Sequence, residues 1–121
     1  MRVLELGQHR FTEVVVLDDP SFDNAACHEY KVKPVGGDQN PPFANVSFQN
    51  GPIKEAGVNG CHHEDLINIV IDRLNSFQKG KFRCRENALA ITKLEEALMW
   101  LNKRTQTRQD KGIEGTNVNH E

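Results

Sequence analysis

The chain has 121 residues, of which 37% are hydrophobic and 26% are charged, and its formal net charge is −2. This length suits one domain with a modest core. No apolar run approaches the roughly 20 residues that cross a bilayer, and the N-terminal sequence MRVLELGQHRF lacks the apolar segment of a secretory signal. We therefore expect a cytosolic protein rather than a membrane or secreted one.

Charge is unevenly distributed along the chain. Residues 1–78 carry 6 Lys/Arg against 11 Asp/Glu, whereas residues 79–111 carry 9 against 4. A basic segment therefore lies inside a weakly acidic chain, and we expect an anionic partner to bind there.

The first half of the chain has the pattern of β-strands. Three segments are rich in β-branched residues or alternate apolar and polar side chains, and turn-forming residues separate them: 11–17, 29–35 and 44–49. Residues 52–55 also look extended, and the pair Asn59-Gly60 after them predicts a tight turn. We expect a small antiparallel sheet.

The second half changes to helical periodicity. Apolar residues spaced by three or four predict an amphipathic helix over 63–78 and a longer one over about 85–111, joined by a short link and therefore antiparallel. Strands followed by helices predict an α+β fold. We expect a single domain with three consecutive parts: a sheet part at 1–60, a helical hairpin at 61–112 and a polar tail at 113–121.

The longer helix is apolar over more surface than one short helix can cover. Its main stripe continues through Ile91, Leu94, Leu98 and Leu101. Leu89, Met99 and Trp100 lie outside this stripe, so a second face also needs burial. We expect a homo-oligomer.

Two residues near the predicted link are candidates for ligand binding. Asn87 interrupts the apolar stripe, either to set the register of a helix interface or to hydrogen-bond a ligand. Phe77 ends the first helix, where it either caps the core or stacks on a base.

Two arginines follow the stripe at the other end of the long helix. Arg104 and Arg108 in the sequence RTQTR are four residues apart, one helical turn, on the same side. They either complement the helix dipole or form an anion site, since the planar guanidinium group suits phosphate.

The predicted link, KGKFRCRE, is basic. As an extended segment it would project Lys79, Lys81, Arg83 and Arg85 to one side. These residues are either solvated charges or, beside Phe77 and Phe82, the rim of a nucleotide site.

Signatures of metal binding and catalysis are missing from the sequence. Cys27, Cys61 and Cys84 form no CxxC pair, and the adjacent ligands in Cys61-His62-His63 would point in different directions. There is no glycine-rich phosphate loop and no HExxH motif. We expect no metal, no cofactor and no catalytic residue.

The sequence also resembles a known family. The stretch FQNGPIKEAGVNG at 48–60 and the long stretch from Glu64 to Thr105, which contains RENALAITKLEEALMWL, resemble the first family of phage Thoeris anti-defence proteins. That family shares its helical hairpin with the anti-CBASS cyclic-nucleotide sponges. The resemblance covers about residues 28–115.

The resemblance implies a phage protein in the cytoplasm of the infected bacterium. Such proteins bind and sequester, without cleavage, the cyclic ADP-ribose isomer made by a TIR-domain sensor, and some also bind cyclic oligonucleotides. Members are dimers or hexamers that hold the ligand between protomers. By similarity, the ligand-binding residues of this chain are Phe77, Asn87, Arg104 and Arg108.

Helix geometry agrees with a site shared between protomers. The arginines follow Asn87 by 17 and 21 residues, about 25–30 Å along a helix, which is farther than one small ligand reaches. Three alternatives stay open. One is a sponge for cyclic di- or trinucleotides; another is a phosphodiesterase that degrades the signal; the third is a DNA-binding regulator, which the acidic first half opposes.

Overall fold

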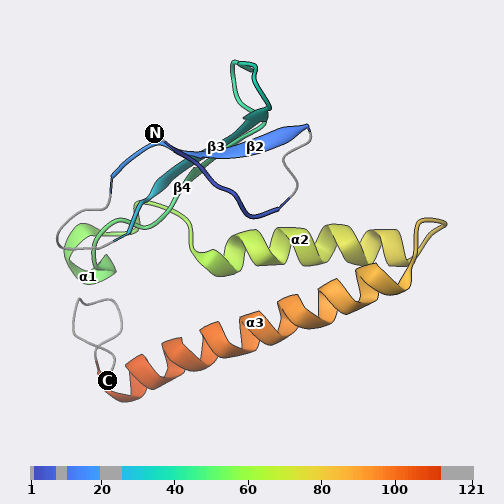
Figure 1. Ribbon diagram of the computed structural model, residues 1–121. Helices are drawn as coiled ribbons and strands as arrows, with labels where there is room; N and C mark the ends of the chain where they lie inside the picture. The colour runs from blue at the N-terminus through green and yellow to red at the C-terminus, as the bar shows by residue number, and fades with distance from the viewer. Residues whose placement is uncertain (1, 8–10, 20–25, 113–121) are drawn as a thin grey trace. The chain divides into compact units, whose positions relative to one another are not determined.

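The chain folds into two compact units, Met1–Cys61 and His62–Glu121. The structure is a computed structural model that describes residues 2–7, 11–19 and 26–112 (Figure 1). The first unit carries the β-sheet and the second carries a helical hairpin. The predicted α+β class is thereby confirmed. The predicted tail at 113–121 lies outside the described residues, and the single domain stays a prediction.

The sheet has four antiparallel strands in the order β1-β2-β3-β4. Their bounds are Arg2–Val3 for β1, Thr12–Val16 for β2, Glu29–Pro34 for β3 and Ala44–Ser47 for β4. Val14 lies opposite Val32, and Tyr30 lies opposite Val46. Val15 is buried and Val16 is fully buried, so the β-branched end of β2 supplies much of the core of this unit. The three strands predicted from the sequence are confirmed, whereas β1 was not predicted.

The predicted extended segment at 52–55 was wrong. Ile53–Ala56 forms the single helical turn α1, whose hydrogen bonds run from Ala56 N–H to Pro52 O at 2.7 Å and from Gly57 N–H to Ile53 O at 2.9 Å. Gly57 has φ of 74°, a left-handed value that suits glycine and stops the helix after one turn.

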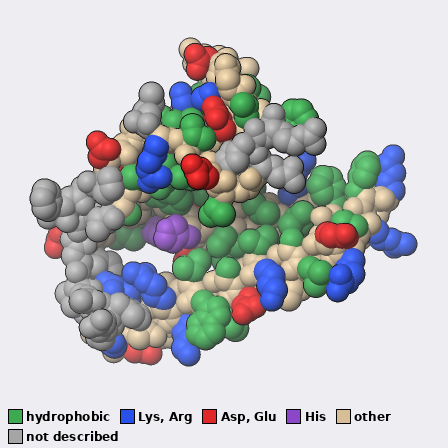
Figure 2. Space-filling view, viewed as in Figure 1, with side chains coloured by type: hydrophobic (Ala, Val, Ile, Leu, Met, Phe, Trp, Pro, Cys, Tyr) green, Lys and Arg blue, Asp and Glu red, His purple; other side chains and the backbone are tan. Residues whose placement is uncertain are grey.

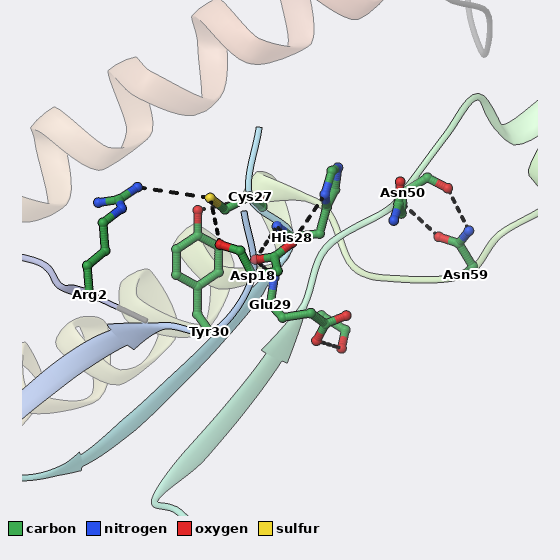
Figure 3. A network of polar contacts seen from close by, with 9 residues as sticks. Arg2, Asp18, Cys27, His28, Glu29, Tyr30, Asn50 and Asn59 are labelled. Atoms are coloured by element: carbon green, nitrogen blue, oxygen red, sulfur yellow. Dashed lines mark hydrogen bonds and ion pairs between the residues drawn. The ribbon is translucent and has the colours of Figure 1, made fainter. Parts of the chain in front are cut away.

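Residues 49–60 form a loop closed by side-chain amides instead of the predicted tight turn at Asn59-Gly60. The Asn59 side chain accepts from Asn50 N–H at 2.8 Å and donates to Asn50 O at 2.7 Å (Figure 3). Cys61 N–H then donates to Ser47 O at 2.8 Å, which returns the chain to the end of β4. Asn50 and Asn59 therefore hold the two ends of the loop together.

The second unit consists of helices α2, His63–Gln78, and α3, Arg85–Asp110, which pack against each other. The predicted helices at 63–78 and about 85–111 are confirmed. Asp65 accepts from the N–H of His62 at 2.8 Å and so caps α2, as its place in the first turn suggests. With 16 and 26 residues, α3 is longer than α2 by about 15 Å.

The apolar stripe of α3 is the more enclosed side of the helix. Ile91 is buried, and Leu94, Leu98 and Leu101 are half-buried. Outside this stripe, Leu89, Met99 and Trp100 remain 45–56% exposed, and Figure 2 shows apolar side chains reaching the surface of the hairpin. Neither this helix nor any other in the described ranges is long and apolar enough to span a bilayer.

Candidate functional site

An aromatic pair marks the end of the hairpin where α2 turns into α3. The rings of Phe77 and Phe82 meet at 75° with their centroids 6.0 Å apart. The guanidinium carbon of Arg73, one turn before Phe77, lies 5.0 Å from the centroid of the Phe77 ring. Phe77 is half-buried, whereas Phe82 is 64% exposed. Aromatic surface and positive charge thus occur together at this end.

The link between the helices is held by the side chain of Gln78. Its Nε2 donates to Cys84 O, and its Oε1 accepts from Cys84 N–H, both at 3.0 Å. Inside the link, Arg83 N–H donates to Gly80 O at 3.3 Å, which closes a turn. These three hydrogen bonds bend the link, so it is not the extended segment that would project its four basic residues to one side.

Asn87 lies in the first turn of α3 and connects that helix to the link. Its N–H donates to Cys84 Sγ at 3.4 Å, and its Nδ2 donates to Phe82 O at 3.4 Å. Within the described residues, its Oδ1 accepts no hydrogen bond. The side chain is half-buried. The side chain of Asn87 therefore has its donor engaged in the fold, while its acceptor is not used by any described residue.

The link beside the aromatic pair is rich in cations. Lys79, Lys81, Arg83 and Arg85 are all exposed, and Figure 2 shows basic side chains at this end of the hairpin. The Lys81 ammonium group lies 5.2 Å from the centroid of the Phe82 ring. This end of the hairpin is suited to a flat, anionic molecule.

The two arginines of the RTQTR sequence lie in the last turns of α3, where α2 no longer runs beside it. Arg104 is exposed, whereas Arg108 is only 7% exposed. They follow Asn87 by 17 and 21 residues on one helix, which separates them from it by about 25 and 31 Å. The structure thus brings Phe77 and Asn87 to one end of the hairpin and leaves both arginines at the other.

A polar network in the sheet unit joins the turn after β2 to the start of β3 (Figure 3). The Asp18 carboxylate accepts from the N–H of Glu29 at 3.0 Å and from the N–H of His28 at 2.8 Å. The bond from Glu29, helped by that from His28, lowers the pKa of Asp18 below its ordinary value of 3.8. This carboxylate therefore stabilises the main chain at the start of β3 by accepting hydrogen bonds from its N–H groups.

The neighbouring Cys27 and His28 are buried in the same network. The Cys27 thiol donates to Asp18 O at 3.2 Å, and His28 Nδ1 lies 3.7 Å from Asp18 Oδ2. Cys27, Cys61 and Cys84 are all unpaired thiols. In the part of the chain that the structure describes, no three His, Cys, Asp or Glu side chains gather closely enough to hold a metal ion.

Sequence reasoning missed the contacts of Arg73, Gln78 and Phe82. The four-residue spacing of Arg73 and Phe77 on a helix could have revealed the first, because such pairs are neighbours on a helix surface. The clamp from Gln78 to Cys84 carries no such signal, since it depends on how the link bends.

Two comparisons with known proteins agree with this hairpin. The family model described as "Acb2/Tad1, hairpin domain" matches residues 41–106, a segment that includes Phe77, Asn87 and Arg104 and stops before Arg108. The protein called "Thoeris anti-defense 1" from Bacillus phage SBSphiJ7 is 45% identical over 133 aligned positions, which cover 93% of this chain and 94% of that protein. The match runs through both units, the N-terminal sheet included.

Proposed function

Because the chain belongs to the Acb2/Tad1 family of phage anti-defence proteins, we propose that it binds and sequesters cyclic ADP-ribose isomers. These are the signals that TIR-domain proteins of the bacterial Thoeris system make. Sequestration in the host cytoplasm would keep the signal from its effector. The observation that supports the proposal lies at the end of the hairpin, where an aromatic pair, the Asn87 acceptor and a cation over each ring occur together.

Each part of such a ligand has a matching group in this chain. The adenine ring stacks on the aromatic pair that includes Phe77. Oδ1 of Asn87 accepts from a base amine or a ribose hydroxyl group. The pyrophosphate needs cations, and Arg104 is exposed at the end of a helix stripe that continues into Arg108.

The ligand lies between two protomers in this proposal. About 25–31 Å of helix separates Asn87 from the arginines, and an antiparallel partner copy brings its own Arg104 and Arg108 to the Phe77 end. The exposed Met99 and Trp100 supply apolar surface for such an assembly. The protein is thus a homo-oligomer whose site is complete only after assembly.

Binding without cleavage follows from the residue types at the site. Phe77, Asn87, Arg104 and Arg108 bind and orient a ligand, but none is a common nucleophile or a general base at neutral pH. The protein therefore acts stoichiometrically: each protein molecule removes a fixed number of signal molecules.

A release experiment tests this function. The protein is incubated with a panel of cyclic ADP-ribose isomers and cyclic di- and trinucleotides, washed by gel filtration and heat-denatured, and the supernatant is chromatographed. We expect an unmodified cyclic ADP-ribose isomer in stoichiometric amount. Hydrolysed product would identify an enzyme instead, release of a cyclic oligonucleotide alone would identify a different sponge, and an empty supernatant would refute the proposal.

A further inference from the structure

We propose that Asn59 is a site of spontaneous deamidation and that this reaction opens the loop 49–60 for good. The intact loop stabilises the unreacted amide, so that the reaction is slow in the folded protein and faster once the loop is open. The proposal concerns the sheet unit and goes beyond the proposed function, on which it does not depend. It starts from the Asn59-Gly60 pair, whose sequence predicts a tight turn but which instead closes this loop.

The Asn59-Gly60 pair has the composition that favours deamidation. The main-chain nitrogen of Gly60 loses its proton to water and attacks Cγ of Asn59. The new N–Cγ bond closes a succinimide ring, while Nδ2 takes up a proton from water and leaves as ammonia. Water then opens the ring at either carbonyl group and yields aspartate or isoaspartate. Asparagine is among the thermolabile residues, a following glycine has no side chain to shield its nitrogen, and the exposed Asn59 is within reach of water.

The folded loop stabilises the amide that has to react. Asn59 Oδ1 accepts from Asn50 N–H at 2.8 Å, and Asn59 Nδ2 donates to Asn50 O at 2.7 Å (Figure 3). Ring closure removes Nδ2 from the side chain and therefore breaks the second of these hydrogen bonds. The main chain is held as well, since Asn59 N–H donates to Gln49 Oε1 at 3.0 Å. These bonds exist only before the reaction, so they slow it.

The packing of Gly60 also opposes ring closure. A Cβ placed on Gly60 would lie 2.4 Å from the main-chain carbon of Phe48 and 2.6 Å from the nitrogen of Gln49, so the backbone here is closely packed. The next residue is held too, because Cys61 N–H donates to Ser47 O at 2.8 Å. The nitrogen of Gly60 therefore has little freedom to reach the geometry of attack while the loop is closed.

The product of the reaction no longer closes the loop. An aspartate side chain at position 59 has no N–H to donate to Asn50 O, and one of its oxygens would face that carbonyl oxygen instead. Isoaspartate also lengthens the main chain just before Cys61, whose bridge to Phe48 fixes the end of the loop. Because ammonia has left, the original amide does not form again.

The rate of the reaction is tested on the full chain at mildly alkaline pH. Peptide mass spectrometry follows the conversion of amide to acid at Asn59, in native buffer and in guanidinium chloride, where the same chain is unfolded. We expect the conversion to be about tenfold or more slower in native buffer. Gln49→Ala removes the bond to Asn59 N–H but leaves the reacting pair unchanged, and it should bring the native rate closer to the unfolded one. Equal rates for native and unfolded wild type, or no conversion in either, would overturn the proposal.

The opening of the loop is tested by hydrogen exchange of the Asn50 and Cys61 amides, which the closed loop protects. Asn59→Asp imitates one product, and its matched control is Asn45→Asp, the same charge change at an exposed asparagine of β4. We expect exchange about tenfold or more faster in Asn59→Asp and unchanged in Asn45→Asp. Aged wild-type protein, separated by ion exchange into modified and unmodified fractions, gives the same comparison without a variant. Equal protection in the two fractions would overturn the proposal.

Discussion

Arg104 and Arg108 lie one turn apart on α3, but only Arg108 is buried. Arg108 continues the half-buried stripe of Leu98, Leu101 and Thr105, and Arg104 lies at its exposed margin. We predict that Arg104→Ala will leave the free energy of unfolding within about 0.5 kcal/mol of wild type and weaken ligand binding by one to two orders of magnitude, roughly the loss of one charge-assisted hydrogen bond. Arg108→Ala should weaken binding and also cost about 1–3 kcal/mol of stability.

Chemical denaturation and calorimetry on the same samples separate the two effects. Equal stability losses for both variants would show that burial of Arg108 does not contribute to the fold. Unchanged affinity in both would remove the arginines from the site.

A mixing experiment tests whether the site is shared between protomers. An Arg104→Ala/Arg108→Ala chain and an Asn87→Ala chain should each bind poorly. In a mixed dimer, one of the two sites would combine intact arginines with an intact Asn87, and the other site would lack both. Mixing should therefore restore binding at about one site in each mixed dimer. Subunit exchange is verified first by mass spectrometry. No recovery after verified exchange would mean that the site is not shared between protomers as proposed.

Trp100 should be part of the assembly interface. It is 56% exposed on α3, with the Lys103 ammonium group 5.4 Å from its ring, and tryptophan is enriched among the residues that dominate interfaces. We predict a wild-type mass of at least twice 13.7 kDa by light scattering, and a smaller assembly for Trp100→Glu. The control is Val58→Glu, at a residue that is 76% exposed in the sheet unit, which should leave the mass unchanged. A monomeric wild type would contradict both the interface and the shared site.

The lowered pKa of Asp18 makes part of the stability depend on pH. Because the folded protein holds this carboxyl group below its ordinary pKa of 3.8, ionised Asp18 stabilises the fold above that value, and the contribution is lost as pH falls through the folded pKa. Asp18→Asn resembles the protonated group. We therefore predict that this variant is less stable than wild type near neutral pH and that the gap closes in acid. Urea titrations across the acidic range measure it, and a gap that stayed constant with pH would contradict the assignment.

Gly60 should tolerate no side chain. A Cβ placed there would lie 2.4 Å from the main-chain carbon of Phe48 and 2.5 Å from its oxygen, and the strand bridge between Phe48 and Cys61 leaves that backbone little freedom to shift. Gly60→Ala should lower the midpoint of thermal unfolding by several degrees or prevent folding of the sheet unit. Gly37→Ala is the control, because its nearest contact would be an ordinary 3.8 Å to Pro34. Equal thermal midpoints would refute the predicted clash.

The sequence predicted those elements whose periodicity extends over several residues. Helix α2 has sixteen residues with apolar side chains at regular spacing, so both of its ends were predicted correctly. Strand β1 has two residues, too few for any alternation to be visible. The error at Ile53–Ala56 had a signal that was overlooked, since Pro52 before the turn and Gly57 after it are typical of helix ends.

The residue types of the candidate site could be predicted from the sequence, but the burial of these residues and their hydrogen-bond partners could not. Spacing alone put Arg104 and Arg108 on one side of a helix, and their different burial depends on the tertiary structure around that helix. Likewise, the basic link was identified from composition, but its bend depends on Gln78 and on the turn at Gly80. Such long side chains find partners that neither spacing nor composition specifies.

The boundary between the two units lies at Cys61 and His62, whereas the family match begins at residue 41. Strand β4 therefore belongs to the matched segment but pairs with β3, which precedes it; Phe43 N–H donates to Val32 O at 2.9 Å at the edge of that pairing. A chimaera joined at residue 41 would combine strands from two different proteins within one sheet. A junction at residue 62 would transfer both helices and the link between them, with every strand pair of the recipient left unchanged, and that is where ligand preferences of two relatives should be exchanged.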